Sequence, residues 1–243
     1  MNIDDDPVRV ASRFTPSWTG LRTNKVRLPP ATYVGGMRGI PIDERDSAWE
    51  RDDARYRLYI FEGPGNAVTT IDIVEATVEQ ALESALAMSN GDEHLWSLAL
   101  VETDARGLRG LIWLSGMDYN DPPTTPWEWQ RRRQMQDRYL IAKSRRDVAT
   151  VLPNGLRLIR VFPEWVSGWP LWENFTAEYR LTGPSLGLTP ELSDALFNWN
   201  EAWLARQEDD PLPAGWEDEG HRLVVRLRSA LDGIAEVRPE FLR

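Results

Sequence analysis

The chain has 243 residues, a formal net charge of -10 at pH 7 and no cysteine. The absence of cysteine excludes disulfides, thiolate nucleophiles and cysteine-ligated metal sites. The negative charge disfavours a mainly electrostatic attachment to nucleic acid or to anionic lipid. The sequence has no apolar run of about 18 residues that would predict a membrane span, and it opens without the basic and apolar regions of a secretory signal. We therefore expect a cytoplasmic protein with no membrane partner, and nucleic acid is a disfavoured partner.

Residues 1–50 are interrupted by proline and glycine and show no sustained hydrophobic period, which predicts an irregular N-terminal arm. Strand-like alternation begins at Tyr56, since Tyr56, Leu58 and Ile60 point to one face and the residues between them to the other. A Gly-Pro-Gly-Asn turn at 63–66 leads into a β-branched stretch at 67–74. This arrangement predicts a first hairpin.

A helix should follow, because Thr77 and Gln80 have the spacing of a capping box and Gly91 marks the helix end. Its apolar residues fall on one helical face: Val78, Ala81, Leu82, Ala85 and Leu86. The apolar stretches 95–101 and 108–115 then predict a second hairpin. Since both stretches are apolar on both faces, we expect both strands in the centre of a sheet.

The second half opens with another capping box, in which Thr125 and Glu128 flank Pro126, and a helix is expected to run to about Arg145. The stretches 148–152 and 156–162, with a Pro-Asn-Gly turn between them, predict a third hairpin. Residues 163–188 form a long segment broken by proline and glycine. Two further helices, from 189 and from 216 to about 231, should pack as an antiparallel pair through tryptophan and leucine.

Together these elements predict an α+β fold with a mainly antiparallel sheet of about six strands in three hairpins. One helix lies between the first two hairpins, and the C-terminal part is helical. We expect residues 1–50 to form the arm, residues 51–121 a sheet-and-helix core, and residues 122–243 a second half packed with that core as one continuous domain.

Positive charge is concentrated in residues 131–146, which carry seven arginine and lysine side chains against one carboxylate. Beside Trp127 and Trp129, such a run resembles the mixture of guanidinium and indole that binds single-stranded nucleic acid. The side chains of three consecutive helical residues, however, spread over about 200° around the helix axis. Arg131, Arg132 and Arg133 therefore cannot form one stripe, and pairing with carboxylates of the same chain is the favoured interpretation.

Catalytic groups are scarce. A serine hydrolase needs a nucleophile with a base beside it, yet the two histidines, His94 and His221, lie in unlike contexts and no Gly-x-Ser-x-Gly occurs. We expect no shared catalytic role for them.

The alternative enzyme site is the loop that contains Asp118 and Asp121, which follows a predicted strand end. These carboxylates would serve a carboxylate-dependent, metal-assisted hydrolase, with Trp113 and Tyr119 lining its cleft. Aspartate beside asparagine and proline is also ordinary turn chemistry, and the turn is the favoured interpretation.

Ten of the twelve tryptophans lie between Trp96 and Trp216. Because indole buries a large apolar area, this concentration predicts a packed scaffold. Exposed indoles at Trp165, Trp169 and Trp172 would instead form a platform for a sugar or a peptide, which is a second alternative function.

The balance of charge, tryptophan and missing catalytic groups favours a non-enzymatic acidic protein-binding module, such as an inhibitor or immunity-type neutraliser of a basic toxin or nuclease. The expected partner is a basic protein. The residues expected to bind it are indoles that anchor the partner and carboxylates that steer it: Trp165, Trp169, Trp172, Glu208, Asp209 and Asp210. No catalytic residue, metal or cofactor is expected.

Overall fold

A computed structural model of the chain describes residues 32–34, 37–47, 49–146, 148–165, 168–207 and 209–241. The chain divides into two units, residues 1–52 and residues 53–243. In the first unit β1 (Thr32–Val34) pairs antiparallel with β2 (Met37–Gly39), and a short 3-10 helix, η1, spans Glu44–Asp46. The predicted irregular arm lies largely outside the described residues, which omit 1–31.

The second unit is α+β, as predicted. Its described part contains two four-stranded sheets and four α-helices rather than one sheet of six strands. The first sheet is antiparallel, with strand order β4-β3-β5-β6. Its strands are β3 (Tyr56–Glu62), β4 (Ala67–Ile73), β5 (Leu95–Thr103) and β6 (Arg109–Ser115). The first two predicted hairpins are therefore confirmed.

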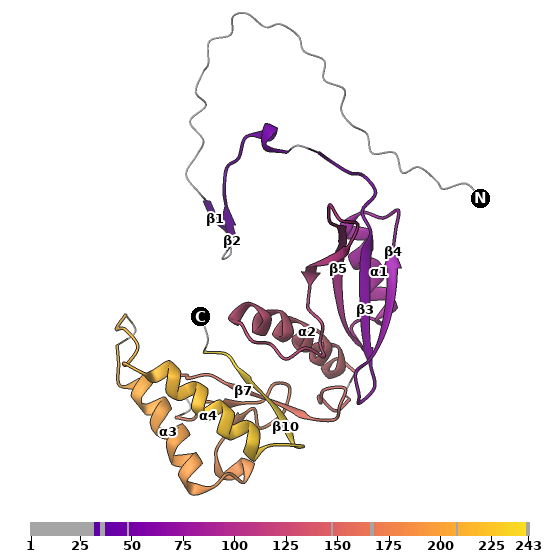
Figure 1. The fold of residues 1–243 in the computed structure, drawn as a ribbon. Coiled ribbons are helices and arrows are strands. Elements are labelled where there is room, and N and C mark those ends of the chain that lie inside the picture. The colour runs from indigo at the N-terminus through magenta and orange to yellow at the C-terminus, as the bar shows by residue number, and fades with distance from the viewer. Residues whose placement is uncertain are drawn as a thin grey trace, which may run out of the picture. The chain divides into compact units, whose positions relative to one another are not determined.

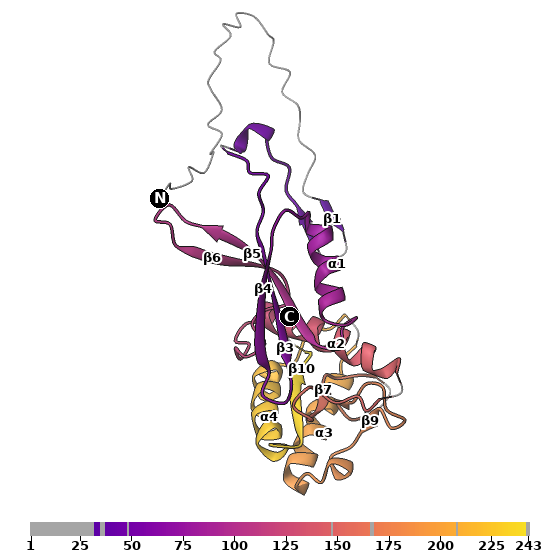
Figure 2. The same ribbon diagram turned by 90° about the vertical axis from the view of Figure 1, so that its right-hand side faces the viewer.

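The prediction that β6 lies in the centre of the sheet is wrong. Among the described residues β6 is an edge strand paired with β5. Leu111, Ile112 and Leu114 are exposed, whereas Trp113 is half-buried beside Tyr59. β5 pairs with β3 through Leu100 and continues to Thr103, so the end of the β5–β6 hairpin extends beyond β3 (Figure 2). Apolar residues on both faces indicate burial only when a further layer covers the strand. Arg131 and Arg138 of α2 contact β6 at Trp113 and Ser115, but Leu111, Ile112 and Leu114 remain exposed.

Helix α1 (Val78–Met88) has the predicted capping box, in which the Thr77 N–H donates to Gln80 Oε1 over 2.9 Å. It packs on one face of the first sheet through Ala81 and Ala85, which are fully buried. Of the five apolar residues expected on one helical face, the other three flank the alanine contact and are exposed: Val78, Leu82 and Leu86.

Helix α2 (Pro126–Ser144) lies between the two sheets. It begins with the predicted capping box of Thr125 and Glu128. Met135, Tyr139 and Leu140 pack in one cluster with Phe61 and Leu95 of the first sheet, and the same cluster includes Leu158 of the second sheet. Both sides of α2 are therefore in contact with strands.

The second sheet has the strand order β10-β7-β8-β9. Its strands are β7 (Arg157–Val161), β8 (Leu171–Trp172), β9 (Arg180–Leu181) and β10 (Ala235–Pro239). β7 pairs in parallel with β10 and antiparallel with β8. The prediction of a third hairpin is wrong. Residues 148–152 form no strand and Val148 is exposed, and the neighbours of β7 are β10 and β8 instead.

Helices α3 (Pro190–Leu204) and α4 (Trp216–Ala230) pack side by side on the second sheet, after a short 3-10 helix, η2 (Pro184–Leu186) (Figure 1). Trp199 and Trp216 stack with ring centroids 4.2 Å apart. Each indole N–H donates to the main-chain carbonyl of the other tryptophan, over 2.9 and 3.0 Å. The two helices and the scaffold role of these indoles agree with the sequence pattern. None of the helices described here combines the length and apolarity needed to cross a membrane.

Candidate functional site

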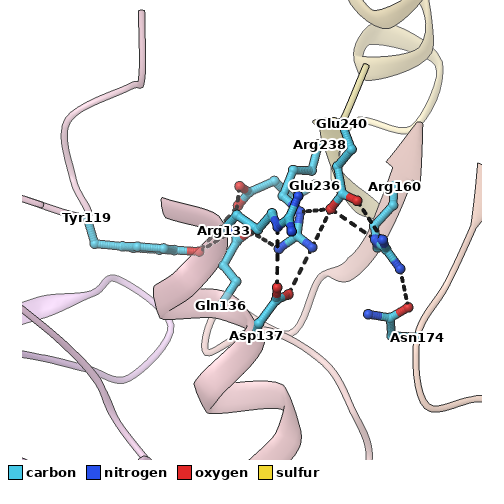
Figure 3. A network of polar contacts seen from close by, with 9 residues as sticks. All are labelled: Tyr119, Arg133, Gln136, Asp137, Arg160, Asn174, Glu236, Arg238 and Glu240. Atoms are coloured by element: carbon cyan, nitrogen blue, oxygen red, sulfur yellow. Dashed lines mark hydrogen bonds and ion pairs between the residues drawn. The ribbon is translucent and has the colours of Figure 1, made fainter. Parts of the chain in front are cut away.

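A network of charged and amide side chains fills the interface between α2 and the second sheet (Figure 3). Side chains alternate along a strand, and the register places Glu236 beside Leu158 and Arg238 beside Arg160. These residues face α2, which supplies Arg132, Gln136 and Asp137. The second sheet is therefore apolar toward α3 and α4 and mainly charged toward α2.

Arg132 and Glu236 form the first part of the network. Arg132 donates from Nε and Nη2 to the two carboxylate oxygens over 2.8 and 3.1 Å, and Gln136 donates to the same carboxylate over 2.7 Å. Burial alone would raise the pKa of Glu236, but the hydrogen bonds and positive charge of Arg132 hold that pKa below its ordinary value. Burial raises the pKa of Tyr119, whose hydroxyl accepts from Gln136 over 2.9 Å.

Arg238 is the centre of the second part and is only 1% exposed. It donates to Glu240 over 2.7 Å, to Asp137 over 2.9 Å and to Gln136 Oε1 over 3.1 Å. Arg160 donates to both oxygens of Glu240, over 2.9 and 2.5 Å. Because buried charges need such partners, we interpret this network as the joint between α2 and the second sheet.

Asp118 lies in a turn. Its Oδ1 accepts from the Asn120 N–H over 3.0 Å, and its main-chain carbonyl accepts from the Asp121 N–H over 3.2 Å. Asp121 is exposed, whereas Tyr119 is buried against Phe61. Within the described ranges, histidine, aspartate and glutamate form no group of three that could hold a metal ion.

The three loop tryptophans have different surroundings. Trp172 is buried and stacks on Phe162 at 5.1 Å, and Trp169 packs edge-on against Phe197 at 5.5 Å. Trp165 is partly exposed and lies 4.3 Å from the Trp203 ring. The structure therefore does not bring the three indoles together as one exposed platform.

The predicted acidic loop is described only in part. Glu208 lies outside the described residues. Asp209 and Asp210 are exposed, and Asp210 accepts from the Gln207 N–H over 2.8 Å. The two histidines are separate: His94 lies 3.9 Å from Glu62, and His221 packs edge-on against Phe241.

The basic run is largely paired inside the molecule. Besides the bond of Arg132 to Glu236, Arg138 lies 3.8 Å from Asp92, Arg133 lies 3.7 Å from Asp137, and Arg146 pairs with Glu93. These pairs are neutral overall, so groups outside them carry the net charge of the chain.

The most prominent unpartnered feature is an apolar edge that the sequence analysis did not single out. We define the β6 edge as Leu111, Ile112 and Leu114, with Leu108 in the preceding turn. All four are exposed, and Ile112 is exposed to 54%. Leu111 and Ile112 point to opposite faces of the sheet. The apolar run itself was visible in the sequence, but nothing in it separated an edge strand from a central one.

The other edge strand of the same sheet provides a contrast. β4 carries Thr69, Thr70 and Asp72, and Asp72 accepts from Arg57 over 2.7 and 3.0 Å. Polar and charged side chains protect an edge from pairing with other chains. β6 has a single charged residue, Arg109, at its start.

Comparisons of the chain with protein-family models, curated proteins and solved structures gave no match.

Proposed function

We propose that this chain is a protein-binding module and that the β6 edge receives an extended strand from a basic protein partner. A free edge presents main-chain N–H and C=O groups, which a strand of another protein satisfies by hydrogen bonding. On β6 the Trp113 carbonyl already accepts from Arg131 over 3.0 Å, so an added strand would pair with the remaining groups. The observation that carries the proposal is the exposure of Leu111, Ile112 and Leu114 at such an edge.

Side chains on both faces of β6 contribute to recognition. Leu111 lies on the face of the sheet that packs on α2, and Ile112 pairs beside Leu100 on the face that packs on α1. A partner strand with apolar residues at alternate positions would extend the sheet and cover both sets of side chains. Main-chain hydrogen bonds would give affinity, and the apolar contacts would give specificity.

The charge of the molecule favours a basic partner. The net charge is -10, and the internal arginine pairs contribute nothing to it. Exposed carboxylates include Asp209, Asp210, Glu217 and Asp218. Complementary charge speeds encounter, and the apolar contact then determines how long the complex lasts. An inhibitor or immunity-type protein directed against a basic toxin or nuclease fits this combination.

Site-specific photocrosslinking in cells of the source organism tests the proposal. A photoreactive phenylalanine analogue replaces Ile112 in the full chain, and the matched control carries it at Val68, an exposed residue on β4. We expect position 112 to capture a basic protein that position 68 does not capture. The purified partner should then bind the wild-type chain, with affinity that falls as ionic strength rises.

The binding assay then uses Leu111→Lys/Ile112→Lys, because lysine on an edge strand opposes strand pairing. This variant should lose at least about 100-fold in affinity, while Val68→Lys keeps the wild-type affinity. The proposal would be refuted by equal crosslinking from positions 112 and 68, or by crosslinking of the chain to a second copy of itself. It would also be refuted if the double-lysine variant bound the partner with wild-type affinity.

A further inference from the structure

A second surface feature lies where the first turns of α2 meet the end of β10, and Arg131 links it to β6 through the Trp113 carbonyl. A cleft of about 440 Å³ is lined by Pro126, Trp127, Trp129, Gln130, Arg133, Pro239 and Glu240. We call it the indole cleft. Its volume falls within the range of about 300–1,000 Å³ typical of small-molecule sites.

The two indoles of this cleft are less buried than the tryptophans of the core. Trp127 is exposed to 58%, whereas Trp199, Trp216 and Trp172 are buried in the core. Trp127 has the Arg131 guanidinium 5.2 Å from its ring centroid, and Trp129 has that of Arg228 at 4.9 Å. An exposed indole held beside guanidinium groups is suited to stacking on a flat ring.

The cleft is surrounded by more positive than negative charge. Arg131 and Arg228 have main-chain carbonyls of Trp113 and Val237 as their hydrogen-bond acceptors, and neither forms an ion pair in the described part of the chain. Arg133, which lines the cleft, is half exposed and lies 3.7 Å from a carboxylate that also accepts from Arg238. Arg133 therefore shares the Asp137 carboxylate with Arg238, and Arg228 is within electrostatic range of Glu236, whereas no ion pair of Arg131 is found in the described residues.

The carboxylates nearby are already occupied. Glu240 lines the cleft but accepts three hydrogen bonds, from Arg160 and Arg238. Glu128, in the first turn of α2, accepts from Thr124 and Thr125 and does not line the cleft. An anion in the cleft would therefore meet guanidinium donors and a neutralised acid.

From this arrangement we infer that the indole cleft binds a nucleotide, with its base stacked on Trp127 and its phosphate paired with Arg133. Arginine offers paired donors that match phosphate geometry. The volume exceeds that of a single flat ring and accommodates a base, a sugar and a phosphate. The same chemistry is presented by a free mononucleotide and by one nucleotide of a single strand.

Fluorine NMR of the full chain labelled with 5-fluorotryptophan tests this inference, with resonances assigned by single tryptophan-to-phenylalanine variants. The probes are adenosine 5′-monophosphate, adenosine, inorganic phosphate and a short oligodeoxyadenylate. We expect adenosine 5′-monophosphate to shift Trp127 and Trp129 and to leave Trp165 unchanged. Trp165 is the matched control, since it is also partly exposed but lies outside the cleft.

Adenosine and phosphate should each bind at least about tenfold more weakly than the nucleotide, because each lacks one of the two contacts. Trp127→Ala and Arg133→Gln should each weaken nucleotide binding about tenfold, while Arg222→Gln, at an exposed arginine on α4, should not. Tighter binding of the oligonucleotide would identify a single strand as the source, and equal or weaker binding a free nucleotide.

Three results would overturn the inference: no shift of Trp127 at millimolar nucleotide, an equal shift of Trp165, or phosphate binding as tightly as the nucleotide. None of these results tests partner binding at the β6 edge. The two proposals are therefore tested by separate experiments.

Discussion

Arg132 on α2 and Glu236 on β10 are joined by two hydrogen bonds of 2.8 and 3.1 Å across 104 positions of the sequence. The same guanidinium lies 3.9 Å from the Tyr119 ring centroid and donates to the Tyr119 carbonyl over 2.7 Å. One side chain therefore ties the segment after the first sheet to the last strand of the second sheet. The two sheets and the helix between them should unfold together.

Glu236→Ala should lower the free energy of unfolding by about 3–5 kcal/mol, because it leaves the Arg132 guanidinium buried without its carboxylate. Urea unfolding followed by circular dichroism measures the change. The double variant Arg132→Met/Glu236→Leu should be more stable than Glu236→Ala, since it leaves no unpaired charge.

The control is the exposed pair of Glu219 and Arg222 on α4, 2.7 Å apart. Glu219→Ala should change stability by no more than about 1 kcal/mol. Similar losses for the buried and the exposed carboxylate would show that the network does not join the layers.

Stability should fall as the pH is lowered below about 5, because Glu236 and Glu240 have pKa values in the folded state below their ordinary value of 4.5. For each, burial raises the pKa, but the paired arginines more than compensate. The unfolded chain therefore takes up protons at a higher pH than the folded chain, and stability is lost as pH falls from the unfolded pKa through the folded pKa.

Urea unfolding of wild type and Glu236→Gln at pH 7, 5, 4 and 3 measures this dependence. The variant should be less stable at pH 7. It should also lose less stability on acidification, because it has one fewer carboxyl group whose pKa is lowered by folding. Parallel curves for the two proteins would contradict the assignment of Glu236 as a source of the pH dependence.

Local sequence signals predicted the elements that local chemistry determines. The capping boxes at Thr77 and Thr125 mark the starts of α1 and α2, and the buried stripe of α4 appears where the helical period places it. Non-local pairing was not predictable in this way. β10 becomes the parallel neighbour of β7 only after α3 and α4 have brought the chain back, so the turn at Gly155 suggested a hairpin that does not form.

The candidate sites show the same division. The internal pairing of the basic run was expected from composition, and Arg132, Arg138 and Arg146 are paired. The exposure of Ile112 was not expected, because an apolar strand has the same residue pattern whether it lies at the centre or at the edge of a sheet. The indole cleft was also missed, since it needs the end of β10 beside α2, a contact between distant segments.

Gly220→Ala should destabilise the protein by about 1–3 kcal/mol, although alanine normally stabilises a helix interior relative to glycine. A methyl group at this position of α4 would lie 2.8 Å from both Phe241 and Trp199. Trp199 is held by its stack on Trp216 and cannot easily move. Thermal unfolding compares this variant with Ser229→Ala, an exposed position on the same helix, where the change should be small. A more stable Gly220→Ala protein would show that this contact tolerates a methyl group.

Asp118→Asn and Asp118→Ala separate a turn role of this carboxylate from a role in partner binding. Asparagine keeps an oxygen that accepts from the Asn120 N–H, so Asp118→Asn should retain wild-type stability, whereas Asp118→Ala should lose about 1 kcal/mol. A carboxylate that binds the partner would behave differently, because both variants would remove its charge and weaken partner binding with little effect on folding. Thermal unfolding of the two variants, combined with binding to the partner captured at β6, makes the comparison. Loss of partner binding in Asp118→Asn at unchanged stability would show that this carboxylate has a role beyond the turn.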